Sequence, residues 1–180
     1  CVAFTKSGVT GFPDMVPVPG DGLIDLVGTC YDKDGIDQTI IVCRSNKRAN
    51  IYNKGIRQSI LFRDDELCTG DLLMVTKNNY YWTEKNKDVD FIANGDVAVV
   101  RRVRKTKELH GFRFAEVVLE FPDYEGMELE VNILLDTLDA DSPALSKEDG
   151  DKLYYSVTED YSDITVKRER LKKVKDDPYY

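Results

Sequence analysis

The sequence predicts a mixed α+β fold, in which a small antiparallel β-barrel lies between two α-containing stretches. Two observations predict this fold. Residues 112–135 alternate apolar and polar side chains with the period of two that half-buried strands show. On either side, residues 22–33, residues 47–60 and the residues after 142 carry apolar side chains at helical spacing. A chain of 180 residues has room for one good-sized domain or two small ones.

The first stretch has the element order of an α/β layer. Asp21 is expected to cap a helix over 22–33, which Asp34-Gly35 ends. The apolar, β-branched run 39–43 predicts a buried parallel strand, because such strands are covered on both faces. A second helix is expected over 47–60. Helix, buried strand and helix in this order are typical of an α/β layer.

The middle of the chain predicts the barrel. Four strands are expected at 71–77, 96–105, 112–121 and 127–135, separated by turn signals such as Asn94-Gly95. In the last strand, the apolar side chains are expected to fill the barrel core: Met127, Leu129, Val131 and Ile133. Short strands joined by turns are typical of a small antiparallel barrel.

The last stretch is helical again. Ser146 and Asp149 resemble a capping box, and Leu153, Val157 and Tyr161 repeat at four-residue spacing. A second, basic helix follows. We expect these helices to pack with residues 20–66 as one layer from which the barrel projects.

Positive charge is concentrated in three segments, although the net charge is −8. Segments 44–57 and 101–107 each hold five basic side chains and no acidic one. Segment 167–175 holds six basic side chains and Glu169. Each run taken alone reads as a solvated face, but three such runs on an acidic chain favour a polyanionic partner.

Several kinds of chemistry have no motif here. The chain lacks GxxxxGK[ST], HExxH and GxSxG, so we expect no catalytic residue and no enzymatic activity of the chain alone. Its four cysteines form no CxxC pair and lie far from His110, so no metal site is expected. Cys30 and Cys43 have apolar neighbours in the sequence and read as reduced core thiols, so a cytoplasmic protein is expected. No apolar run approaches the ~18 residues of a membrane helix, so no membrane partner is expected.

Three ordered segments carry a family resemblance. They read IIVCRSNKRANIYNKGIRQSI at 40–60, GDLLMV followed by KNNY at 70–80, and FIANGDVAVV at 91–100. Together they resemble the second RecA-like domain of superfamily 1 DNA helicases of the RecD and UvrD kind, relatives of the exodeoxyribonuclease V alpha subunit. Two departures are a long polar stretch at 81–90 and Ala98, where the family often has glycine.

The resemblance implies a domain organisation and a parent protein. Residues 1–69 would be part of a RecA-like α/β layer, 70–136 an inserted SH3-like barrel, and 137–180 a helical return to the layer. The chain would be a piece of an ATP-dependent DNA helicase with a role in DNA repair. Its ATPase motifs, with ATP and Mg²⁺ as cofactors, would lie outside this chain. Its partners would be single-stranded DNA or a DNA junction, and the rest of the helicase chain.

The first candidate nucleic-acid-binding residues follow the predicted strand 39–43. Arg44, Ser45, Asn46 and Arg48 lie where open α/β sheets bind ligands, at the carboxyl end of a strand. Guanidinium groups bind phosphates through two hydrogen bonds, and the short Ser and Asn side chains can hydrogen-bond to oxygens of the nucleic-acid backbone. The alternative is that Ser45 or Asn46 caps the next helix and the arginines are solvated.

Further candidates belong to the barrel. Asn78, Asn79 and Tyr80 either hold a turn at the barrel mouth or bring Tyr80 and its aromatic neighbours to stack on bases. Arg102 and Arg104 alternate along one strand and are expected to share a face, opposite Arg101, Val103 and Lys105.

The leading hypothesis is therefore a helicase fragment that contributes to single-stranded DNA binding and strand separation. The alternative is a non-catalytic β-barrel module for protein interaction, which would use the acidic remainder of the chain and its exposed aromatic side chains. A free-standing hydrolase based on carboxylates is the weakest hypothesis.

Overall fold

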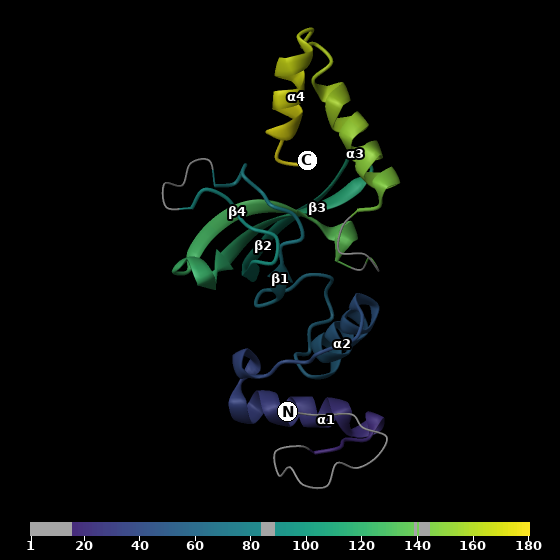
Figure 1. Cartoon of the computed structure of the whole chain (residues 1–180), viewed down its shortest axis with the longest axis vertical. Coiled ribbons are helices and arrows are strands. Elements are labelled where there is room, and N and C mark those ends of the chain that lie inside the picture. The colour runs from purple at the N-terminus through teal and green to yellow at the C-terminus, as the bar shows by residue number, and fades with distance from the viewer. Residues whose placement is uncertain (1–15, 84–88, 139, 141–144) are drawn as a thin grey trace. The chain divides into compact units, whose positions relative to one another are not determined.

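The structure is a computed structural model that describes residues 16–83, 89–138, 140 and 145–180 (Figure 1). The chain forms two compact units, divided between Asp64 and Asp65. Across these described ranges, no helix combines the length and apolar character that crossing a bilayer requires.

The N-terminal unit contains the two predicted helices. They are α1, Leu23–Asp34, and α2, Asn46–Ser59. Gly35 ends α1 in the left-handed region, with a φ of 92°, and its N–H donates to the Tyr31 carbonyl at 3.1 Å. Asp21 does not cap α1: it lies in a short 3-10 turn, Gly20–Gly22, and no side-chain hydrogen bond caps the N-terminus of α1.

The predicted buried strand at 39–43 is wrong. No strand occurs among residues 16–64, and the side chains of Ile40 and Val42 are 85% and 87% exposed. A parallel strand needs neighbouring strands to take its backbone hydrogen bonds, and the described residues of this unit form none. This unit therefore has the two helices of the expected layer without its strand.

The C-terminal unit is built on an antiparallel sheet in which all four predicted strands are confirmed (Figure 1). The strands are β1, Leu72–Met74, β2, Val97–Leu109, β3, Phe112–Phe121, and β4, Met127–Leu134. They pair in sequence order, β1-β2-β3-β4, as a curled half-barrel. The fold class is thus mixed α+β with a curled antiparallel sheet.

The inner face of the sheet is the larger core. Val100, Val117 and Phe121 are at most 1% exposed, and Val131 and Leu135 join them from β4 and the turn after it. Leu129, Ile133 and Met127 pack against this cluster. The predicted core face of β4 is therefore confirmed.

Two irregularities in β2 change the predicted faces of its basic residues. The register with β3 shifts between Val100 and Arg102 and again between Val103 and Lys105, as at β-bulges. As a result Arg102 pairs with Val118 and Lys105 with Glu116 on the outer face, while Val103 packs in the core. The expectation that Arg102 lies opposite Lys105 is wrong, because each bulge adds one residue and restarts the alternation.

The two C-terminal helices, α3, Lys147–Asp160, and α4, Lys167–Lys175, cover one part of the outer face of the sheet. Phe112 and Phe114 of β3 form a second core with three helical side chains: Leu153, Val157 and Val174. The expectation that these helices pack with residues 20–66 is wrong, since they cover the sheet instead. Phe112 and Phe114 point away from the inner core, so an apolar surface remains that needs cover.

The capping box before α3 is confirmed. The Ser146 hydroxyl oxygen accepts from the Asp149 N–H at 3.0 Å, and the Ser146 hydroxyl donates to the Asp149 carboxylate at 2.7 Å. These bonds fix where α3 begins.

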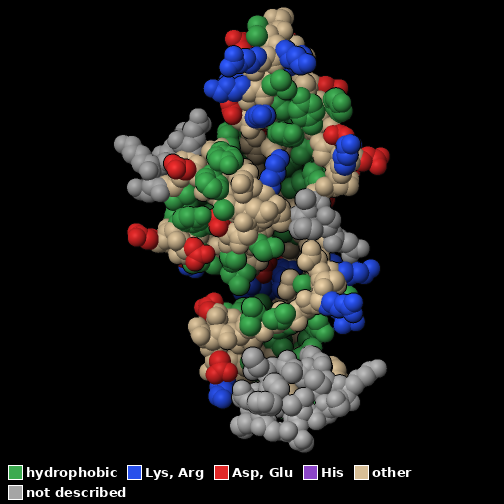
Figure 2. Space-filling model, viewed as in Figure 1, with side chains coloured by type: hydrophobic (Ala, Val, Ile, Leu, Met, Phe, Trp, Pro, Cys, Tyr) green, Lys and Arg blue, Asp and Glu red, His purple; other side chains and the backbone are tan. Residues whose placement is uncertain are grey.

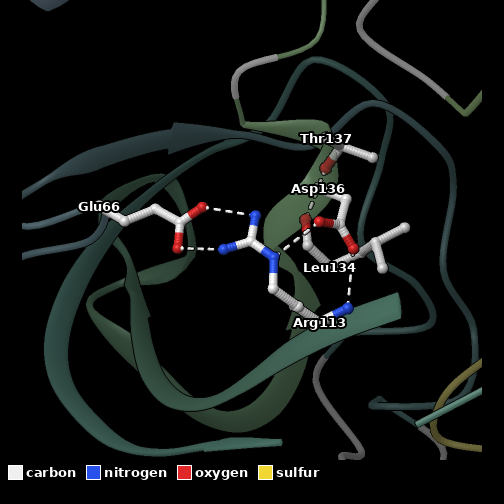
Figure 3. A network of polar contacts seen from close by, with 5 residues as sticks. All are labelled: Glu66, Arg113, Leu134, Asp136 and Thr137. Carbon is white, nitrogen blue, oxygen red and sulfur yellow. Dashed lines mark hydrogen bonds and ion pairs between the residues drawn. The ribbon is translucent and has the colours of Figure 1, made fainter. Parts of the chain in front are cut away.

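An arginine network ties the start of this unit to its sheet (Figure 3). The Arg113 guanidinium on β3 donates to both carboxylate oxygens of Glu66 at 2.9 Å, and its Nε donates to Asp136 at 2.9 Å. The Arg113 backbone N–H also donates to Asp136, at 2.7 Å. One side chain thus joins the segment before β1, the strand β3 and the turn after β4.

Candidate nucleic-acid interface

The first candidate residues gather at the N-terminus of α2. Ser45 is extended, with a φ of −150°, and its hydroxyl oxygen accepts from the Arg48 N–H at 3.4 Å, so Ser45 is the helix cap. Asn46 is the first residue of α2, and Arg44 and Arg48 are exposed. Ser45 therefore caps α2, as the alternative interpretation predicts. The two arginines remain accessible to a ligand beside the positive end of the helix dipole.

Asn78 and Asn79 hold a turn. The Asn78 side-chain oxygen accepts from the Asn94 N–H at 2.8 Å. The Asn79 side-chain oxygen accepts from the N–H groups of Tyr81 and Trp82 at 3.0 and 3.2 Å. Asn79 also exchanges two backbone hydrogen bonds with Ile92. The Asn79 side chain thus holds the loop at 78–82, while the Asn78 side chain and the Asn79 backbone join that loop to the segment at 92–94.

Asp96 completes the same turn. Its carboxylate accepts from the Ala93 N–H at 2.7 Å and from the Tyr124 hydroxyl at 2.6 Å. The bond from Tyr124, with burial of the ring, raises the pKa of Tyr124 above its ordinary value. Asn94-Gly95-Asp96 is therefore a structural turn, which the hydrogen bonds from Ala93 and Tyr124 to Asp96 hold in place.

Tyr80 is the member of this group that faces solvent. Its ring stacks on Phe91 with centroids 5.1 Å apart and planes at 29°. Tyr80 is 61% exposed and Phe91 37% exposed, so the stacked pair leaves aromatic surface open to water. Trp82, by contrast, packs against the inner core of the sheet. Of the three aromatic residues at 80–82, Tyr80 is thus the one best placed to stack on a base.

The basic run of β2 is largely balanced by glutamates on its neighbours. Arg101 pairs with Glu120 of β3, and Lys107 pairs with Glu116. The bonds from Lys107 and Arg101 hold the pKa values of Glu116 and Glu120 below their ordinary range.

Arg104, one of the candidate residues, also has an acidic partner. Its guanidinium binds both carboxylate oxygens of Glu130 on β4. Arg102 and Lys105 are exposed and make no ion pair with any other residue that the structure describes. This strand is thus a cross-strand ion-pair surface with two open cations, rather than a wholly positive stripe.

Ser156, His110 and Asp160 form an arrangement that sequence spacing did not show. His110 Nδ1 lies 3.0 Å from the Ser156 hydroxyl and Nε2 lies 3.5 Å from Asp160. Ser156 lies inside α3, where backbone N–H groups are bonded along the helix and cannot form an oxyanion hole. A cavity of 570 Å³ near the start of α3 is lined by residues such as Gly111 and Lys152, and neither Ser156 nor His110 lines it. The contacts therefore anchor the β2–β3 turn to α3.

A further group of exposed cations, which the sequence analysis did not name as candidate site residues, lies on α4. The sequence shows the positive charge of residues 167–175, but it does not show whether acidic neighbours pair with these side chains. In the structure five of its six basic residues are exposed: Lys167, Arg168, Lys172, Lys173 and Lys175. Figure 2 shows Lys and Arg side chains gathered over the helix that Figure 1 labels α4.

The candidate residues thus divide between the two units. Among the residues that the structure describes, no three His, Cys, Asp or Glu side chains are grouped to hold a metal ion. The arrangement offers cationic and aromatic surfaces, which bind anions and rings. No protein-family model, curated protein or solved structure matches the chain.

Proposed function

We propose that this chain is part of an ATP-dependent DNA helicase of the RecD-like kind and contributes to single-stranded DNA binding and strand separation. ATP hydrolysis, with its ATP and Mg²⁺, belongs to other parts of the parent protein. The proposal rests on the ordered motifs, of which 77–80 and 91–100 are hydrogen-bonded together through Asn78, Asn79 and their partners. Segments that are joined in this way act as one structural unit.

In this proposal the curled sheet is the SH3-like barrel of the family, and residues 16–64 belong to a RecA-like layer that the parent chain completes. Exposed apolar side chains support the second part. Ile40, Val42 and Phe62 are all more than 80% exposed, an arrangement that costs free energy unless another surface covers them.

The exposed Tyr80–Phe91 pair supports a single strand as the ligand. Unpaired bases present their flat faces, and stacking on an aromatic side chain contributes about 1–3 kcal/mol per base. In a duplex the same faces are covered by neighbouring bases. The pair is thus suited to the separated strand rather than to double-stranded DNA.

Fluorescence anisotropy with a labelled oligothymidylate of about 20 nucleotides tests the proposal on the whole 180-residue chain. We expect weak binding whose logarithm falls linearly with the logarithm of salt concentration, with a slope of about −0.7 for each phosphate contacted. A duplex of the same length should bind more weakly. Absence of oligothymidylate binding at low salt would favour the protein-interaction module instead.

A further inference from the structure

The basic helix α4 differs from the other two basic runs in how its charge is balanced. Its six cations make no hydrogen bond or ion pair with any other residue within the described ranges. In β2 three of five cations are paired with glutamates, and in the run at 44–57 Lys47, Lys54 and Arg57 have partners. Among the described residues of the C-terminal unit, α4 therefore holds the largest group of basic side chains without an ion pair.

The packing of α4 determines on which side of the helix these basic side chains lie. Val174 is fully buried against α3 and the sheet, and Arg170, one turn earlier, is half-buried. At 100° per residue, Arg168, Lys172 and Lys175 follow one another along a single stripe turned away from Val174. A stripe with about 5–6 Å between successive cations suits the phosphates of an extended strand.

Exposed aromatic rings lie around the C-terminal segment that follows α4. Tyr180 is 42% exposed and lies 5.7 Å from Tyr154, whose ring contacts Tyr155 at 5.6 Å. Tyr155 is 66% exposed. The Lys77 ammonium lies 5.4 Å over the Tyr180 ring. Lys77 thus links the C-terminus to the loop that carries Tyr80.

The C-terminal segment is held firmly enough to present these rings. The Tyr161 hydroxyl of the α3 end donates to Asp177 at 2.7 Å, and the Tyr179 N–H donates to the same carboxylate at 2.8 Å. The Tyr179 ring packs edge-on against Phe114 of β3 at 5.1 Å. Rings held in position lose less conformational entropy when a base stacks on them.

We infer that α4 and the exposed rings of Tyr80, Tyr155 and Tyr180 bind a single-stranded nucleic acid, with phosphates on the lysine and arginine stripe and bases on the rings. The ligand class rests on the proposed function. An acidic peptide would use the cations, but it would leave the flat aromatic faces without a role. Cations beside stacking rings are the combination that binds single strands without sequence preference.

Matched charge-neutralising variants of the whole chain test this surface with the same oligothymidylate. Lys172→Gln with Lys175→Gln removes two cations from α4, and Arg102→Gln with Lys105→Gln removes two unpaired cations from β2. We expect the α4 pair to lower affinity about tenfold at low salt and to reduce the salt slope by about 1.4, the loss of two contacts. The β2 pair removes Arg102, a candidate binding residue, so it should also lower affinity, but by about threefold or less. Equal thermal unfolding of both pairs controls for folding.

A second variant tests the rings. Tyr80→Ala with Tyr155→Ala should weaken binding about fivefold or more while leaving the salt slope unchanged, because stacking releases no counterions. A loss of affinity in the β2 double variant, with unchanged affinity in the α4 double variant, would overturn the inference and leave the proposed function standing. Equal losses for single strands and duplex, with no effect of the tyrosine variants, would show a general polyanion surface instead. Absence of binding by the unaltered chain would overturn both proposals.

Discussion

At the scale of single residues, hydrogen bonds to carboxylates hold the C-terminal unit together. Tyr161 donates to Asp177, and this bond, with burial and nearby carboxylates, raises the pKa of Tyr161 from 10.0 to about 12. The folded-state pKa lies above the ordinary value, so the bond stabilises the fold fully below pH 10. That contribution is lost as pH rises from 10 to about 12.

Tyr161→Phe should therefore lower the free energy of unfolding by about 1 kcal/mol at neutral pH. The difference from the unaltered chain should shrink towards zero between pH 10 and 12, where tyrosinate forms. Urea unfolding at several pH values measures both effects. A difference that stays constant across this range would show that Tyr161 does not titrate with the bond in place.

The candidate residues show what sequence can and cannot give at this scale. Asn78 and Asn79 are predictable as turn residues because their short amides bond to nearby backbone. Their partners at 92–94 are not, since the sequence does not say which segment closes the loop. Likewise, the run at 101–107 is visible as charge, but Glu120 and Glu130 balance it only through strand pairing.

At the scale of elements, the alternating pattern of β3 and β4 carries the fold. Val131 is 6% exposed on the inner face of β4 and belongs to the main core. Val131→Asp should destabilise the chain by about 3 kcal/mol or more, because the fold would bury an unpaired charge. Glu130→Asp, on the outer face beside it, is the matched control and should change stability little.

Thermal or urea unfolding followed by circular dichroism gives the comparison. Stability of the Val131→Asp variant equal to that of the unaltered chain would contradict the strand register, since a one-residue shift exchanges the two faces.

The elements that were predicted wrongly have one feature in common: residues distant in the sequence determine their surroundings. The run at 39–43 has the composition of a buried strand, yet its Ile40 and Val42 are exposed and no described residue of its unit pairs with it as a strand. The bulges in β2 arise from pairing with β3, and a run of similar basic residues gives no sign of where an extra residue is inserted. The alternation places Phe112 and Phe114 on one face of their strand, but the sequence does not specify that α3 and α4 cover them.

At the scale of the whole molecule, the described structure comprises a helical N-terminal unit and a C-terminal unit of sheet and helices. Most of the residues proposed to bind single-stranded DNA belong to the C-terminal unit. It carries the unbalanced cations of α4 and the exposed rings of Tyr80, Tyr155 and Tyr180. Arg44 and Arg48 provide a separate exposed pair in the first unit.

Photo-crosslinking maps the strand directly. An oligothymidylate of about 20 nucleotides, with iodouracil at successive positions, is irradiated with the whole chain, and the crosslinked peptides are identified by mass spectrometry. The account predicts crosslinks at Tyr80, Tyr155 or Tyr180, because iodouracil reacts with the aromatic ring on which it stacks. Crosslinks confined to residues 44–57 or to β2 would contradict it.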